Sequence, residues 1–80
     1  MTEWKKDSST HYVKILGEGL IVCMVDTTYT VIEGEIKEKW SGGINGNWYF
    51  FNRDNADITM AKVDRLLEKK LKILKKELGW

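Results

Sequence analysis

His11 and Cys23 are the residues best suited to covalent chemistry, since the chain contains one histidine and one cysteine. An imidazole beside a thiol is the minimum for a nucleophile activated by a general base. A two-residue hairpin turn at Glu18-Gly19 would pair His11 with Asp26. The same register would pair Cys23 with Lys14, on the opposite face of the sheet. The spacing therefore predicts that no dyad forms.

Other catalytic or ligand-binding constellations have no recognisable spacing. Cys23 lies in a continuous apolar run, residues 20–25, which is typical of a buried thiol that packs as a small hydrophobic residue. A metal would have to use one histidine and scattered carboxylates. Gly42, Gly43 and Gly46 are not followed by the GK[ST] sequence of a phosphate loop and are interpreted as hairpin residues. We therefore expect a protein that is not an enzyme and binds no metal or cofactor.

The elements that must position any site form one small domain, residues 1–80. We expect a loosely ordered arm over residues 1–10, although Trp4 could dock, and a β-meander over residues 11–52. Alternation and turn residues predict four antiparallel strands, at residues 11–16, 20–25, 29–40 and 48–52, with a turn at residues 26–28. A helix follows at residues 57–78, with Asn55 or Asp57 as its N-cap and Gly79 as its stop. The expected fold class is α+β, with the long amphipathic helix packed on one face of the sheet.

The helix is long for so small a domain. At 1.5 Å per residue it would extend for roughly 30 Å, whereas strands of six or seven residues cover about 20 Å. Its apolar stripe begins with residues that we expect to pack against the sheet, namely Met60, Val63 and Leu67. The distal part of the stripe would need another contact, most simply a second copy of the chain: Leu71, Leu74 and Leu78. This pattern predicts a homodimer or a helix contact with a partner.

The aromatic hairpin around Asn45-Gly46 is the strongest candidate for a binding surface. A two-residue turn there would place Trp48 and Phe50 on one face of the sheet. The other face would hold Trp40, Ile44, Tyr49 and Phe51. Because the helix covers one face only, Trp48 and Phe50 are predicted to be exposed, as aromatic contact residues often are. The alternative is that Trp4 or Trp80 folds over them, or that the register differs by one residue.

Charge is unevenly distributed along a chain whose net charge is +1. Residues 17–38 contain five acidic side chains and one lysine, a net charge of −4. Residues 57–80 contain seven basic and four acidic side chains, a net charge of +3. The acids expected to contact a partner are Glu33, Glu35 and Glu38. The lysines that would contact nucleic acid, in a second and less favoured interpretation, are Lys69, Lys72 and Lys76.

The chain has the composition of a soluble protein, with 42% apolar and 31% charged residues. A single cysteine permits no intramolecular disulfide, which fits a reducing, cytoplasmic setting. The polar residues 1–10 lack the apolar core of a signal peptide, and the longest apolar run, six residues, is too short to span a membrane. We expect no membrane association.

In length, aromatic content and lack of catalytic constellations, the chain looks like the small accessory proteins that phages and mobile elements carry. The resemblance is one of size and composition and transfers no residue. It implies a non-enzymatic binding module, an inhibitor of the anti-CRISPR or another anti-defence type, that occludes a larger host protein. The alternatives are a nucleic-acid-binding protein that uses its basic helix, or a structural homodimer.

Overall fold

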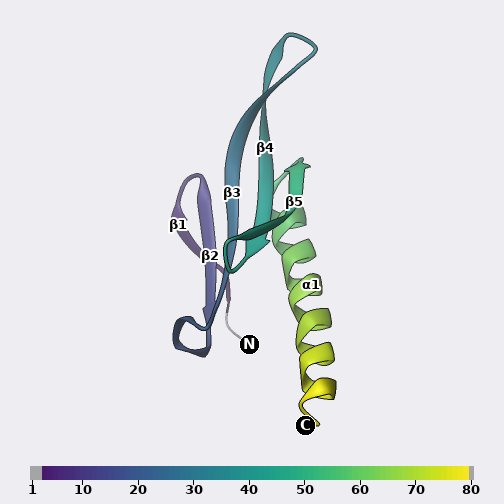
Figure 1. The fold of residues 1–80 in the computed structure, drawn as a ribbon. Helices are drawn as coiled ribbons and strands as arrows, with labels where there is room; N and C mark the ends of the chain where they lie inside the picture. The colour runs from purple at the N-terminus through teal and green to yellow at the C-terminus, as the bar shows by residue number, and fades with distance from the viewer. Residues whose placement is uncertain (1–2, 80) are drawn as a thin grey trace.

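The computed structural model describes residues 3–79. They form a five-stranded antiparallel sheet, in the order β1-β2-β3-β4-β5, followed by one helix (Figure 1). The bounds are β1 Lys5–Ser8, β2 His11–Leu16, β3 Ile21–Ile32, β4 Glu35–Ile44, β5 Asn47–Arg53 and α1 Ala56–Glu77, with a short 3₁₀ turn, η1, at Gly17–Gly19. The α+β class is confirmed, with a helix after an antiparallel meander. The expected number of strands, four, was wrong by one.

The additional strand is β1, which lies within the arm that was expected to be loosely ordered. It pairs with β2, with Lys5 opposite Val13. The preceding Trp4 docks on the helix, where its indole Nε1 donates to both carboxylate oxygens of Asp64 at 3.0 and 3.1 Å. Lys14 of β2 is buried at 4% exposure and donates to the same carboxylate at 2.6 Å. This polar cluster ties the beginning of the chain to α1 and orders it.

The long β3–β4 hairpin differs most from the expectation. Residues 26–28 continue β3 instead of turning, and the chain reverses at Glu33 and Gly34, both of which have positive φ, 53° and 79°. Two successive residues with positive φ characterise a tight hairpin turn whose twist matches that of the strands. The expected strand at 29–40 is therefore divided between the end of β3 and the start of β4.

The helix begins and ends where local signals predicted. The Asn55 side chain accepts from the backbone N–H of Ile58, and Gly79 follows the helix with a φ of 74°. The helix packs on β4 at Gly42, where an added Cβ would lie 2.6 Å from Val63 Cγ2. Gly42 thus serves close helix–sheet packing, and its interpretation as a hairpin residue was wrong. The buried apolar residues between the sheet and α1 are Cys23, Val25, Trp40, Ile44, Val63 and Leu67.

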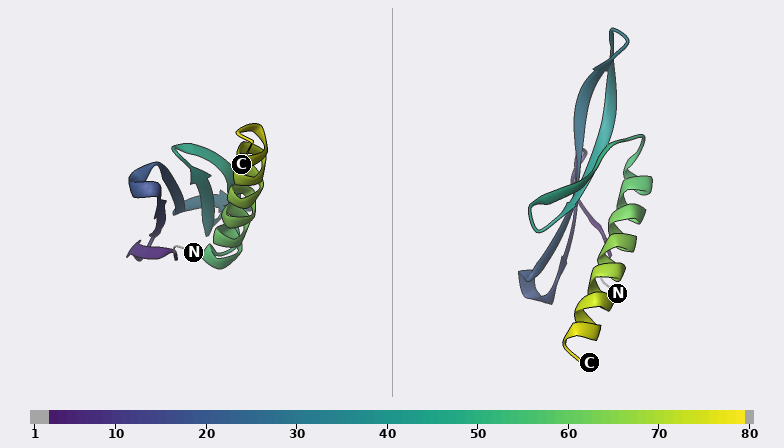
Figure 2. Two further views of the ribbon diagram at one scale, coloured as in Figure 1. Left: turned by 90° about the horizontal axis from the view of Figure 1, so that it is seen from below. Right: turned by 45° about the vertical axis from the view of Figure 1, so that its right-hand side comes forward.

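The elements extend in opposite directions from this core. The end of the β3–β4 hairpin projects beyond the start of α1, and the end of α1 projects past the opposite end of the sheet (Figures 1 and 2). The result is an elongated molecule, 52 × 23 × 18 Å. Both projections carry apolar side chains that no other part of residues 3–79 covers.

Candidate interaction surfaces

The projecting end of the β3–β4 hairpin, residues 28–39, is the most exposed apolar surface. We call it the hairpin tip. β2 pairs with β3 only as far as Asp26, and β5 pairs with β4 only as far as Trp40. The two strands of the tip therefore pair with each other alone, and both of their outer edges are open. An isolated two-stranded hairpin is marginally stable in water.

One face of the hairpin tip is apolar. Tyr29, Val31 and Ile36 are 68%, 69% and 74% exposed. The continuous β3–β4 register puts them on the same sheet face as Val25 and Gly42, which lie under the helix. They extend the core-facing side of the sheet beyond the point where α1 begins.

The opposite face of the tip is polar, with Thr30 opposite Lys37 and Thr28 opposite Lys39. Lys39 reaches Asp54 at 2.7 Å, and this cation holds the pKa of the Asp54 carboxyl below its usual value. Alternation of this kind is typical of a hairpin with one buried face. In the tip, however, the apolar face with Tyr29, Val31 and Ile36 is exposed.

The three acids expected on one strand, Glu33, Glu35 and Glu38, do lie together on the hairpin tip, but on different sides. Glu33 is in the turn, so its placement within the expected strand at 29–40 was wrong. Glu35 forms a salt bridge of 2.9 Å with Lys37. Glu38 is opposite Tyr29, on the apolar face. The acids therefore surround the apolar patch of the tip.

Trp48 and Phe50 do not share a face, contrary to the prediction. Trp48 is opposite Gly43 as expected, but the register then shifts and Phe50, instead of Tyr49, is opposite Gly42. This irregularity inserts one residue and reverses the side-chain alternation. Trp48 is exposed on the sheet face away from α1, where it lines a hollow with Phe51.

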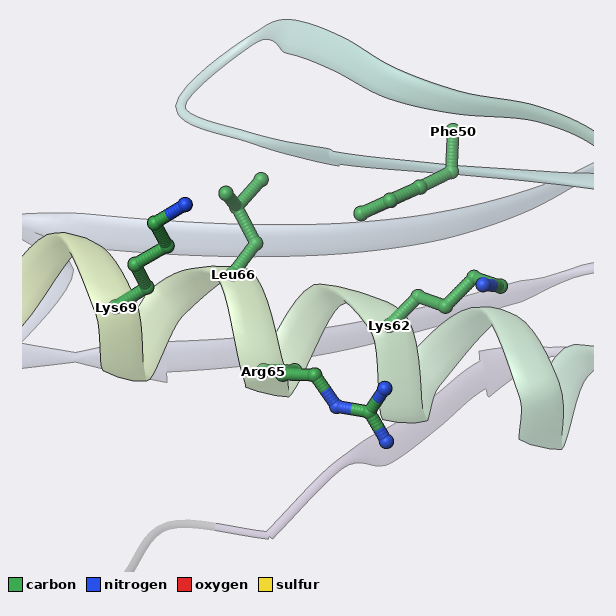
Figure 3. Close-up of a pocket in the computed structure, with 5 residues that line it drawn as sticks. All are labelled: Phe50, Lys62, Arg65, Leu66 and Lys69. Carbon is green, nitrogen blue, oxygen red and sulfur yellow. The ribbon is translucent and has the colours of Figure 1, made fainter.

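Phe50 instead points from β5 toward α1 and forms one wall of an open cleft of about 260 Å³ (Figure 3). The helix supplies the rest of its lining, Lys62, Arg65, Leu66 and Lys69. The Arg53 guanidinium lies 5.9 Å from the Phe50 ring centroid and adds a further cation. We call this site the basic cleft; no acidic residue lines it.

The predicted lysines continue from the basic cleft along the helix. Lys69 is in the cleft lining, and Lys72 and Lys76 follow on exposed turns of α1. Sequence reasoning missed Lys62 and Arg65 as part of this set, although the spacing was visible: Arg65 is four residues before Lys69, and Lys62 is three before Arg65. It also missed Tyr29, Val31 and Ile36, for which the alternation around Glu33-Gly34 was the available signal.

The distal helix stripe is exposed as well. Leu71 and Leu74 lie in the last third of α1 and Leu78 is its C-cap residue, and each is more than a third exposed. As expected from the length of the helix, the sheet of the same chain leaves these leucines partly exposed.

The residues suited to covalent chemistry are kept apart. His11 is opposite Asp26 and Cys23 is opposite Lys14, so the predicted register is confirmed and the two lie on opposite faces. Cys23 is fully buried, and burial raises the pKa of its thiol. Within residues 3–79, no three His, Cys, Asp or Glu side chains are grouped as metal ligands, and the helix is not apolar enough to cross a membrane.

Comparisons of the chain with protein-family models, with curated proteins and with solved structures found no match.

Proposed function

We propose that this protein is a non-enzymatic binding module that docks its hairpin tip on a larger host protein. The observation that carries the proposal is the exposure of Tyr29, Val31 and Ile36 on one face of a projecting hairpin. Three large apolar side chains side by side form the kind of patch that marks a contact site.

The open strand edges of the hairpin tip support the same proposal. Backbone N–H and C=O groups along the outer edges of residues 28–32 and 35–39 have no neighbouring strand within residues 3–79. A partner can add a strand to such an edge and receive the side chains of one face in its pockets. Binding would order a hairpin that is marginal on its own.

The charges of the tip define the chemistry of the partner. Glu33, Glu35 and Glu38 surround the apolar face. The two lysines of the tip are each paired with a carboxylate, Lys37 with Glu35 and Lys39 with Asp54. A matching surface would have an apolar centre and a cationic rim, because complementary potentials favour encounter and register. Such rims occur where a host protein binds nucleic acid.

A narrower function follows from that match. We propose that the protein acts as an inhibitor, of the anti-CRISPR or another anti-defence type, by occupying a nucleic-acid-binding surface of its target. Its small size, projecting tip and peripheral acids support this role. The direct assay is inhibition of the target's nucleic-acid binding at stoichiometric amounts of this protein.

The test of the docking surface compares the wild type with one double variant of the tip and one control variant. Tagged wild-type protein should capture one near-stoichiometric protein from host lysate after nuclease treatment and a high-salt wash. Val31→Ser combined with Ile36→Ser should lose that capture, while Leu20→Ser, at the opposite end of the sheet and 76% exposed, should keep it. Equal capture by all three proteins would remove the tip from the proposal.

The acids are tested separately. Glu33→Lys combined with Glu35→Lys should abolish partner binding and leave the melting temperature nearly unchanged, since both side chains are exposed. Unchanged affinity would show that the acidic rim takes no part in recognition.

A homodimer is the second candidate, favoured by the exposed distal leucines of α1. If Leu71, Leu74 and Leu78 pair with their counterparts in a second copy, sedimentation at high micromolar concentration should give the dimer mass. Leu74→Glu should then restore the monomer. A wild-type protein that remains monomeric at that concentration would exclude this arrangement.

A further inference from the structure

The outer side of α1 carries a continuous ridge of cations. At about 100° per residue, five basic residues lie within about 40° of one direction, from the cleft beside Phe50 round to the outer side of the helix. We call them the cationic ridge: Lys62, Arg65, Lys69, Lys72 and Lys76. They extend over about 21 Å of helix. The ridge is thus a line of positive charge along one edge of the molecule.

Few acids offset the charge of the ridge. None of its five side chains makes a salt bridge to another residue among 3–79. Like charges three and four residues apart destabilise a helix. Of the acids of the same helix, Asp64 is bound to Lys14 on the side of β2, and Glu68, three residues from Arg65 and four from Lys72, lies beside the ridge. Five cations against one neighbouring acid favour an external anion.

The basic cleft adjoins the ridge and supplies a second type of contact. Phe50 points from β5 toward the helix. From the helix, Leu66 and Lys62 extend toward the side where Phe50 lies, and Arg65 points outward (Figure 3). The cleft volume, about 260 Å³, is below the roughly 300–1,000 Å³ of sites that enclose whole drug-sized ligands. It has room for one planar ring against Phe50.

Arg53 adds an unsatisfied donor beside the same ring. Its Nε is buried and has no hydrogen-bond partner among the described residues. Its guanidinium is 5.9 Å from the Phe50 ring centroid. The ring that forms one wall of the cleft thus lies beside a cation whose Nε has no partner among residues 3–79.

We infer that the basic cleft and the cationic ridge bind single-stranded nucleic acid. One unpaired base stacks on Phe50, and phosphates of the neighbouring nucleotides follow Lys62, Arg65 and Lys69 along the helix. Aromatic stacking together with a line of cations is how proteins bind single strands without sequence preference. A duplex offers no free base for the cleft. An acidic protein segment has no planar ring at a fixed position next to its charges, so the observations favour the single strand.

The first experiment is fluorescence anisotropy of a fluorescein-labelled oligothymidylate of about 15 nucleotides, titrated with the whole protein at several salt concentrations. With three to five phosphates contacted, log affinity should fall with log salt at a slope of about −2 to −3.5. A labelled duplex of the same length should bind more weakly. Equal binding of the duplex or of polyglutamate would overturn the inference in favour of unspecific attraction or an acidic protein partner.

Two pairs of variants separate the two contacts. Lys69→Ala should weaken binding and reduce the salt slope by about 0.7, the amount of one phosphate contact. Lys37→Ala, an equal change of charge at the hairpin tip, should leave both quantities unchanged. Equal effects of the two lysine variants would contradict a site on the ridge.

Phe50→Leu should lower affinity about 5- to 150-fold with the slope unchanged, as for loss of one stacked base. Phe50→Tyr keeps the ring and should retain affinity. Since Phe50 also packs against the core, the melting temperature of each variant is measured first. If both variants fold and bind alike, stacking on Phe50 is excluded.

Discussion

Gly42 is the point at which helix and sheet approach most closely, and Gly42→Ala tests the packing directly. An alanine Cβ would lie 2.6 Å from Val63 Cγ2 and 2.9 Å from Thr59 Cγ2. Carbon atoms are best separated by about 3.5–4.0 Å. Val63 and Thr59 are both fully buried, so neither methyl group can move into open space. The helix itself must shift outward by about 1 Å to accommodate the new methyl group.

Two opposing terms set the magnitude. Excess volume in a packed core costs about 1–3 kcal/mol. Replacing glycine by alanine inside a strand contributes about 0.5–1 kcal/mol in the other direction, since glycine loses more conformational freedom on folding. We therefore expect Gly42→Ala to lower the free energy of unfolding by about 0.5–2 kcal/mol. For a domain of this size, 1 kcal/mol corresponds to about 4–8 °C in melting temperature.

The assay is urea unfolding, followed by circular dichroism, of Gly42→Ala, Val63→Ala and the double variant. Val63→Ala alone removes buried methyl groups and should cost about 1.5–3 kcal/mol. It also removes Cγ2, the atom that meets the new Cβ. The double variant should therefore be about 0.5–2 kcal/mol more stable than the sum of the single effects predicts.

Gly43→Ala is the matched control, because its Cβ would meet the backbone carbonyl of Asn47 instead of the helix. It should also destabilise the protein, but Val63→Ala should not relieve that cost. The reasoning is refuted if Gly42→Ala stabilises the protein, or if its effect and that of Val63→Ala simply add. Either result would mean that α1 is not seated on Gly42.

Three further predictions concern polar groups. Lys14→Met should lower the free energy of unfolding by about 1–3 kcal/mol, because it leaves Asp64 without its buried partner; adding Asp64→Asn should recover part of the loss in urea unfolding. The lowered pKa of Asp54 implies stability that is present above its unfolded value, 3.8, and lost as pH falls through the lower folded pKa. Lys39→Met should therefore be less stable than wild type at neutral pH and equal to it in acid, and a difference that persists in acid would contradict the pairing. Burial and a raised pKa predict that Cys23 reacts with a disulfide reagent at the rate of unfolding, so that urea accelerates labelling; fast labelling of the native protein would show an accessible thiol.

The local parts of this structure could be predicted from the sequence. The helix, its Asn55 cap and its Gly79 stop follow from contacts within one or two turns, and the apolar stripe identified the side that packs on the sheet. The register of β2 with β3 followed from a short turn, which brings neighbouring residues together without distant help. The separation of His11 from Cys23, and hence the absence of a dyad between them, was already contained in that register.

The candidate surfaces depended on features that only the tertiary structure decided. The residues at 26–28 resemble a turn, yet they continue β3 because β4 pairs with them along its whole length. That choice moved the reversal to Glu33-Gly34 and created the hairpin tip. Irregular pairing in β5 then turned Phe50 toward the helix and left Trp48 on the other face. The sequence by itself determined the helix and most of the strand residues, through local contacts. Pairing between distant residues decided that residues 5–8 form β1, that residues 26–28 continue β3 and which side chains are exposed, since each inserted residue reverses the side-chain alternation that follows it.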